Sequence, residues 1–155
     1  MRTANRFAIA IQSLCLLGCI EEGEATSEWM AESIGVNPVV VRNILGRLRR
    51  AGLVRTQQGA AGAHLTRLPT DITLLDVYNA VEEEGTLFGR HAHPNPHCPV
   101  GTQIPLMLDN IFGSAQQTLE DYLASVTLAQ VVTELRTTST TSFPCPDTNH
   151  QHNRL

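Results

Sequence analysis

The chain has no lysine, and aromatic residues make up only 5% of its 155 residues. Its 11 basic side chains are therefore all arginine, and 15 acidic side chains bring the formal net charge to −4. As an average over the chain, this charge argues against nucleic acid as a partner, because affinity for phosphate comes from positive charge. The average hides a second absence, since no acidic residue lies between Glu32 and Asp71. That segment has a local charge of +6, because it holds six arginines: Arg42, Arg47, Arg49, Arg50, Arg55 and Arg67.

Further absences narrow the class of protein. The sequence has no glycine-rich phosphate loop, no nucleophile elbow and no pair of carboxylates in a polar setting, so we do not expect an enzyme. The apolar run 7–20 lacks a small-residue cleavage site and is too short to span a bilayer, which favours a buried helix over a signal peptide. The cysteines do not form the dense framework of a small secreted protein, so we expect reduced thiols in a cytoplasmic chain: Cys15, Cys19, Cys98 and Cys145.

Apolar spacing and capping residues predict three helices at the start of the chain. Apolar residues recur at helical spacing over 4–20. Thr26 and Ser27 can cap a second helix of about eight residues, which Gly35 ends. An N-cap asparagine followed by proline starts a third helix over 37–51.

A hairpin and two more helical patterns follow. Residues 53–57 and 63–67 alternate as two strands around a turn of glycine and alanine. Helix, turn, helix and two-stranded wing make a winged helix-turn-helix. A capping-box pattern starts a fourth helix over 74–84, and a long apolar pattern covers 100–124. We therefore expect a mainly α fold with a small β-hairpin wing and a long C-terminal dimerisation helix.

The third helix has two unlike faces. Its apolar residues lie on one arc about 100° wide, which is expected to face the core: Val41, Ile44, Leu45 and Leu48. The opposite arc is rich in arginine and carries no acidic residue. A solvated surface helix would use both signs of charge, because opposite charges three or four residues apart stabilise a helix. The one-sided charge therefore favours a surface for DNA.

The chain divides into four parts. Residues 1–84 form the DNA-binding domain, 85–99 a sensor-like loop, 100–135 the dimerisation helices, and 136–155 a tail with little to bury, which we expect to be disordered. The long helix shows more apolar surface than one small domain can cover, so we expect it to pack on a second subunit. The stripe assigned to this homodimer interface is Ile104, Leu108, Ile111, Ala115, Leu119 and Tyr122.

Three stretches, 37–54, 59–65 and 71–81, together resemble the Rrf-two family of bacterial winged-helix transcription regulators, the group of IscR, NsrR and CymR. The segment 87–104, with one cysteine in an NP-x-CPVG setting, is similar to the YwnA-like branch of that family. The resemblance implies a homodimer joined by the late helix, with the third helix and the wing on two half-sites of a palindromic operator. It also implies a regulator of transcription, which we expect to be a repressor.

Two departures from the family pattern matter. Relatives that bind an iron–sulfur cluster place three cysteines before the long helix, whereas this loop has Cys98 alone, so we expect no cofactor. Many relatives also have an arginine directly before the first wing glycine, suited to a narrow minor groove. Gln58 stands there in this chain, and Ala63 stands where a glycine is common.

The candidate DNA contacts come from the second helix, the third helix and the wing. Those expected near base edges include arginine and asparagine, which bind guanine and adenine in bidentate fashion. Arg49, Arg50 and Arg55 are expected on phosphates. The full set is Ser27, Asn37, Val39, Val40, Arg42, Asn43, Arg47, Arg49, Arg50, Arg55, Gln58, Gly59 and Gly62.

Cys98 leaves more than one hypothesis open. As a thiolate favoured by nearby histidines and by a helix start, it could respond to oxidants or electrophiles; as a small apolar residue, it could simply be packed. Thiolate and imidazole also suit zinc, so a metal-responsive site is an alternative, built from His91, His93, His97 and Cys98. A winged-helix module for an acidic protein partner, without DNA binding, is a further alternative.

Overall fold

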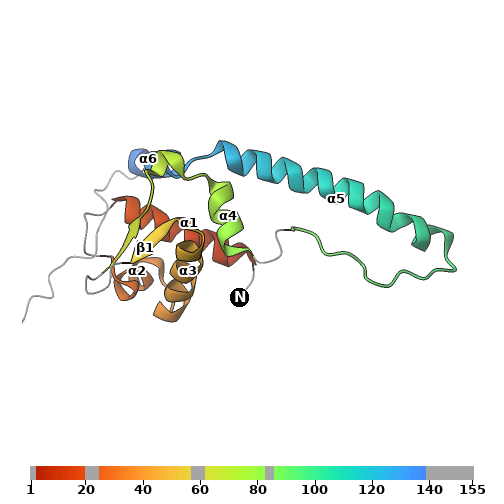
Figure 1. The fold of residues 1–155 in the computed structure, drawn as a ribbon, viewed down its shortest axis with the longest axis horizontal. Coiled ribbons are helices and arrows are strands. Elements are labelled where there is room, and N and C mark those ends of the chain that lie inside the picture. Colours follow the sequence, from red (N-terminus) through yellow and green to blue (C-terminus); the bar gives the residue numbers. More distant parts are fainter. Residues whose placement is uncertain (1–2, 20–24, 57–61, 83–85, 139–155) are drawn as a thin grey trace, which may run out of the picture.

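The computed structural model describes residues 3–19, 25–56, 62–82 and 86–138 (Figure 1). Helices form most of these residues, and the two strands pair antiparallel, with Val54 opposite Leu65 and Thr56 opposite Ala63. The mainly α fold with a β-hairpin wing is thereby confirmed. The elements in chain order are α1 (Thr3–Cys19), α2 (Ser27–Ile34), α3 (Pro38–Arg50), β1 (Val54–Thr56), β2 (Ala63–Leu65), a 3-10 turn η1 (Pro69–Asp71), α4 (Leu74–Val81), α5 (Pro99–Ser125) and α6 (Leu128–Thr138).

The helix-turn-helix pair begins and ends where the capping residues predict. Thr26 Oγ1 accepts a hydrogen bond from the Trp29 N–H at 3.2 Å and so caps α2. Gly35 ends that helix at φ 78°, a left-handed conformation that favours glycine. Asn37 Oδ1 then accepts from the Val39 N–H at 2.9 Å and starts α3. Local chemistry alone thus sets the turn between the two helices.

The core of the DNA-binding domain lies between α1, α3 and α4. Leu14 of α1 is fully buried, as are Ile44 and Leu48 of α3 and Val77 of α4. The apolar start of the chain is therefore a core helix, as expected. None of the helices within the described residues is long and apolar enough to cross a membrane.

The long helix α5 projects away from this domain but is fixed to it at its C-terminal end (Figure 1). The Leu74 N–H donates to the Val126 carbonyl at 2.9 Å, and the Leu128 N–H donates to the Ile72 carbonyl at 2.8 Å. These two bonds tie the start of α4 to the junction between α5 and α6. The capping box between Thr73 and Asp76 starts α4 at this same point.

The fourth helix is shorter than the sequence predicts. It ends at Val81, because Glu82 has extended backbone angles, φ −94° and ψ 119°. The Glu82 side chain is only 4% exposed, and its carboxylate lies 3.8 Å from the guanidinium of Arg6. The predicted helix over 74–84 is therefore wrong at Glu82, which leaves the helix and pairs with Arg6 of α1; 83–84 lie outside the described residues.

The last helix is longer than predicted. It continues to Thr138, so the first three residues of the expected disordered tail, 136–138, are helical. Threonine hydroxyls form hydrogen bonds at this end of the helix: those of Thr137 and Thr138 both donate to the Glu134 carbonyl, at 2.9 and 2.8 Å. Residues 139–155 of the tail, including Cys145, lie outside the described residues.

Candidate nucleic-acid interface

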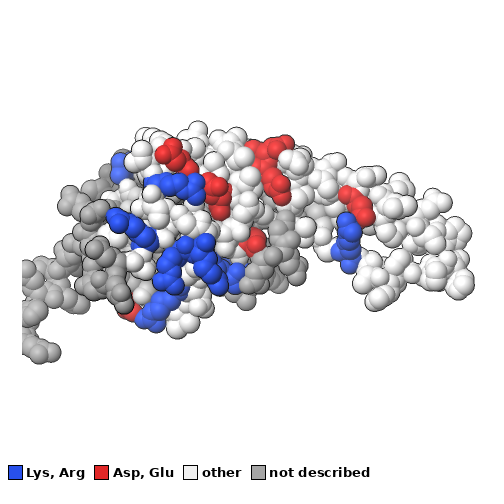
Figure 2. Space-filling model, in the orientation of Figure 1, with Lys and Arg blue, Asp and Glu red and all other residues white. Residues whose placement is uncertain are grey.

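Positive charge is concentrated in one region of the molecule, although some arginines lie beside carboxylates elsewhere. Arginines gather over α3 and the hairpin, while acidic side chains lie mainly along the side formed by α4, α5 and α6 (Figure 2). The outer side of α3 is exposed, and the inner side is buried, with Leu45 8% exposed and Leu48 fully covered. The exposed members that the sequence assigns to DNA are Val39, Arg42, Asn43, Arg49 and Arg50.

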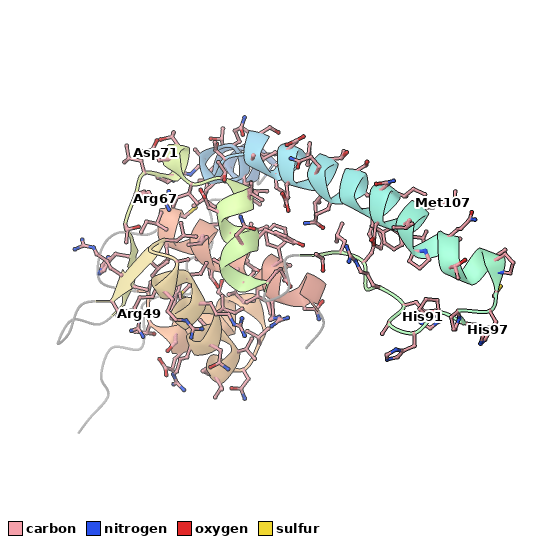
Figure 3. All side chains as sticks on the ribbon, turned by 45° about the vertical axis from the view of Figure 1, so that its right-hand side comes forward. Arg49, Arg67, Asp71, His91, His97 and Met107 are labelled. Carbon is pink, nitrogen blue, oxygen red and sulfur yellow. The ribbon has the colours of Figure 1, made fainter. Side chains whose placement is uncertain are left out.

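A groove of about 430 Å³ lies between α2, α3 and the hairpin. Ser27, Arg42, Arg49 and Gly62 are among its lining residues. Arg49 Nη1 donates to Thr56 Oγ1 at 3.3 Å, which holds this cation between α3 and β1 (Figure 3 labels Arg49). Four residues of the predicted DNA surface thus line one groove: Ser27, Arg42, Arg49 and Gly62.

Gly62 holds the base of the wing against the chain that precedes α2. It has φ 110°, and a Cβ at this position would lie 3.4 Å from the backbone of Ala25. The next residue, Ala63, donates its N–H to the Ala25 carbonyl at 3.2 Å. A side chain at Gly62 would therefore be strained and crowded. The other two predicted wing contacts, Gln58 and Gly59, lie outside the described residues.

Several predicted DNA contacts are engaged within the protein. Arg47 Nη1 donates to the Val81 carbonyl at the end of α4, at 3.4 Å. Val40 is partly buried against the core, and Asn37 uses its side-chain oxygen Oδ1 to cap α3. Arg55 is exposed on β1, as a phosphate contact requires.

Arg67 belongs to the basic segment of the sequence but not to the arginine-rich surface around α3 and the hairpin. It donates to the Asp71 carbonyl at 3.4 Å and lies 3.9 Å from the Asp76 carboxylate (Figure 3). The charge of +6 counted along the chain is therefore divided between two surfaces. The surface around α3 holds the larger share.

One carboxylate lies on this arginine-rich surface, and its residue precedes the acid-free segment in the sequence. Glu28, near the start of α2, forms an ion pair with Arg42, and Ser27 Oγ donates to the second carboxylate oxygen of Glu28 at 3.2 Å. A hydrogen bond from its own backbone N–H, and then the Arg42 and Ser27 bonds, lower the pKa of Glu28. Sequence reasoning missed Glu28 because no local pattern links residues 14 positions apart on different helices.

The predicted sensor-like loop lies along α5. The Leu87 N–H donates to Gln116 Oε1 at 3.0 Å, and Arg90 Nε lies 3.0 Å from the Asp109 carboxylate. Between these points the rings of Phe88 and Phe112 stack with centroids 4.7 Å apart. The loop therefore covers one side of the helix (His91 and His97 mark it in Figure 3).

Cys98 is a partly exposed free thiol at the N-cap of α5. It lies at the end of a tight turn, in which the Cys98 N–H donates to the Asn95 carbonyl at 3.2 Å. Gly101 fits inside this turn, where a Cβ would lie 2.9 Å from the Asn95 carbonyl oxygen. By contrast, burial raises the pKa of Cys15 in α1 to about 11, with the neighbouring Cys19 adding to the shift, so the Cys15 thiol stays protonated near neutral pH.

The histidines of the loop are exposed. Across the part of the chain that the structure describes, no three histidine, cysteine, aspartate or glutamate side chains lie close enough together to hold a metal ion. The alternative site built from the three loop histidines and Cys98 therefore gains no support from the geometry.

Another side of α5, which the loop does not cover, is also apolar. Met107 is 60% exposed, Ile111 58% and Tyr122 67%, and Ile104 also belongs to this side. Of the predicted stripe, Ile104, Ile111 and Tyr122 are thus exposed, whereas the other members are half-buried: Leu108, Ala115 and Leu119. The half-buried members lie toward the side of α5 that the loop before it covers.

The fold and the charge of this surface define a class. A helix-turn-helix pair with a wing and an arginine-rich third helix belongs to the winged-helix DNA-binding proteins. Residues 3–134 match the Rrf2 family model, described as an iron-dependent transcriptional regulator. The chain belongs to the Rrf2 family of helix-turn-helix transcriptional regulators.

Individual relatives agree with this assignment. The HTH-type transcriptional regulator YwnA of Bacillus subtilis is 42% identical over 131 residues, which are 84% of this chain and 97% of YwnA. A solved structure described as a DNA-binding protein is 40% identical with a TM-score of 0.69, covering 81% of this chain and 97% of its own. CymR of B. subtilis shares the fold at 17% identity, with a TM-score of 0.64 over 86% of this chain and 97% of its own.

Proposed function

We propose that this regulator is a repressor that binds a palindromic operator as a homodimer, with α3 in the major groove of each half-site. The observation that carries the proposal is the exposed face of α3, which carries Asn43 and arginines, two of which, Arg42 and Arg49, line a groove shared with α2 and the wing. Arginine and asparagine can read guanine and adenine edges there, and Val39, 54% exposed, can contact a thymine methyl group.

The uncovered side of α5 supports the dimer. Exposed large apolar residues repeat along it from Val100 to Tyr122, and a contiguous apolar surface of this kind marks an interaction site. A twofold pairing of α5 with its copy would bury the same side on both chains and present two copies of α3 to one DNA duplex.

Cys98 is the proposed point of regulation. A peroxide would transfer one oxygen atom to the Cys98 thiolate, giving sulfenic acid and releasing hydroxide. The bulkier, more polar group would then adjoin the tight turn that holds Gly101, where a Cβ on Gly101 would lie only 3.3 Å from the Cβ of Cys98, and we propose that it displaces this turn. Such a displacement at the start of α5 would change the dimer and thus the spacing of the two copies of α3.

Selection of bound genomic DNA fragments, with and without hydrogen peroxide, tests the proposal. We expect the purified protein to enrich fragments that share a palindromic sequence, and peroxide to reduce the enrichment. Equal retention of all fragments would contradict operator recognition. Failure to retain any DNA would instead favour the module that binds an acidic protein.

A further inference from the structure

The DNA-facing groove contains a carboxylate that its neighbours hold in place. Glu28 Oε1 pairs with Arg42 Nη2, and Glu28 Oε2 accepts from Ser27 Oγ at 3.2 Å. Both Glu28 and Arg42 line the groove between α2, α3 and the hairpin. Figure 2 shows acidic atoms beside the arginines at the lower edge of the molecule. A carboxylate at this point repels DNA phosphates, so there must be another reason for its presence in the groove.

That reason is the orientation of Arg42. The side chains of Glu28 and Arg42 are 61% and 54% exposed, so an unrestrained arginine at this position would sample many rotamers and contact whichever phosphate is near. The Glu28 carboxylate takes up one N–H of the guanidinium, which leaves four of its five donors in a fixed fork. Two of them suffice for a bidentate contact with guanine.

We propose that Glu28 is a positioning residue for base recognition: it fixes Arg42 toward a guanine edge and keeps it from acting as a general phosphate contact. Ser27, which the sequence assigns to DNA, takes part by holding the carboxylate. The inference rests on the proposed binding of α3 in the major groove.

The chain offers a matched control on the same helix. Glu32 lies one turn after Glu28 on α2 and is exposed. Glu32→Gln therefore removes the same charge from the same helix without touching the ion pair. Because Glu28 and Arg42 are both exposed, substitutions at either position leave the core intact, which a thermal unfolding curve verifies.

The experiment compares the full-length protein with its Glu28→Gln, Glu32→Gln, Arg42→Gln and Glu28→Gln/Arg42→Gln variants. Each is titrated with the operator enriched from genomic DNA and with every single base substitution of one half-site. We expect Glu28→Gln to lower discrimination at one base pair by about tenfold and to raise affinity for unrelated DNA, with a steeper salt dependence. In the Arg42→Gln background, the same change should leave discrimination at that base pair unaltered.

Two results would overturn the inference. One is Glu28→Gln behaving as Glu32→Gln does, while the wild-type protein still binds its operator with discrimination; the proposed function would then stand and only the role of Glu28 would fall. The other is an equal loss of discrimination with and without Arg42, which would show that Glu28 acts by another route. If the wild-type protein retains no DNA, the proposed function and this inference both fail.

Discussion

The guanidinium of Arg47 on α3 donates to the backbone carbonyl of Val81, the last residue of α4. This contact fastens the helix proposed to enter DNA to the point where the chain leaves for the sensor-like loop. Arg47 is half-buried, and a guanidinium held at the end of α4 is less free to reach a base. We therefore propose that Arg47 supports the position of α3, in place of the base contact that its arginine-rich surroundings predict.

Replacing Arg47 by methionine should therefore act on stability. We expect the free energy of unfolding to fall by about 1 kcal/mol, because a partly buried hydrogen bond from a charged donor is lost. Arg50→Met is the matched control, since Arg50 is exposed at the end of the same helix and should change stability by less than about 0.5 kcal/mol. Urea unfolding of both variants provides the comparison, and equal losses would refute the assignment.

A charge on the uncovered side of α5 should separate the dimer. Ile111→Glu would place a carboxylate in the proposed interface, where its desolvation is costly. We expect sedimentation equilibrium to give the mass of one chain for this variant and of two chains for Asn110→Glu, which adds the same charge at the adjacent exposed position. A dimer that survives Ile111→Glu would place the interface elsewhere.

The response to oxidants should depend on Cys98 alone. With Cys98→Ser, peroxide should no longer release the operator in a gel-shift assay, because the serine hydroxyl is not oxidised under these conditions. Cys19→Ser should keep the wild-type response, and the buried Cys15, whose pKa is about 11, should not react. Release from the Cys98→Ser protein at the wild-type peroxide concentration would remove Cys98 as the sensor.

Two glycines of α5 should respond in opposite ways to alanine. Gly101→Ala would push a Cβ to within 2.9 Å of the Asn95 carbonyl oxygen, so we expect a loss of about 1–3 kcal/mol or a displaced turn. Gly113 has no such neighbour within 4 Å, and Gly113→Ala should raise stability by about 0.5–1 kcal/mol. Thermal unfolding measures both changes. A stabilising Gly101→Ala would show that the turn is not packed on the helix.

The sequence predicts the local structure of this protein well because local chemistry determines it. Asn37 with Pro38, and Thr26 with Gly35, mark the helix-turn-helix pair through bonds within a few residues. The division of α3 into an apolar and an arginine-rich face likewise follows from helical periodicity.

Contacts between distant elements escape the same reasoning. Glu28 reaches Arg42 only because α2 packs on α3, and Glu82 is buried only because α1 places Arg6 beside it. The loop before α5 likewise takes its place through residues on the facing helix, such as Asp109. Which arginine is exposed, and which is engaged within the protein, is therefore decided by packing.

The salt dependence of operator binding, measured for the wild type and two arginine variants, tests the central claim most directly. If the exposed face of α3 contacts DNA, the logarithm of the association constant falls linearly with the logarithm of salt concentration. Arg50→Met should reduce that slope by about 2 for a dimer, one phosphate contact per subunit, whereas Arg47→Met should leave the slope unchanged. Binding that does not weaken with salt, or a slope that Arg50→Met leaves unaltered while Arg47→Met reduces it, would contradict this account.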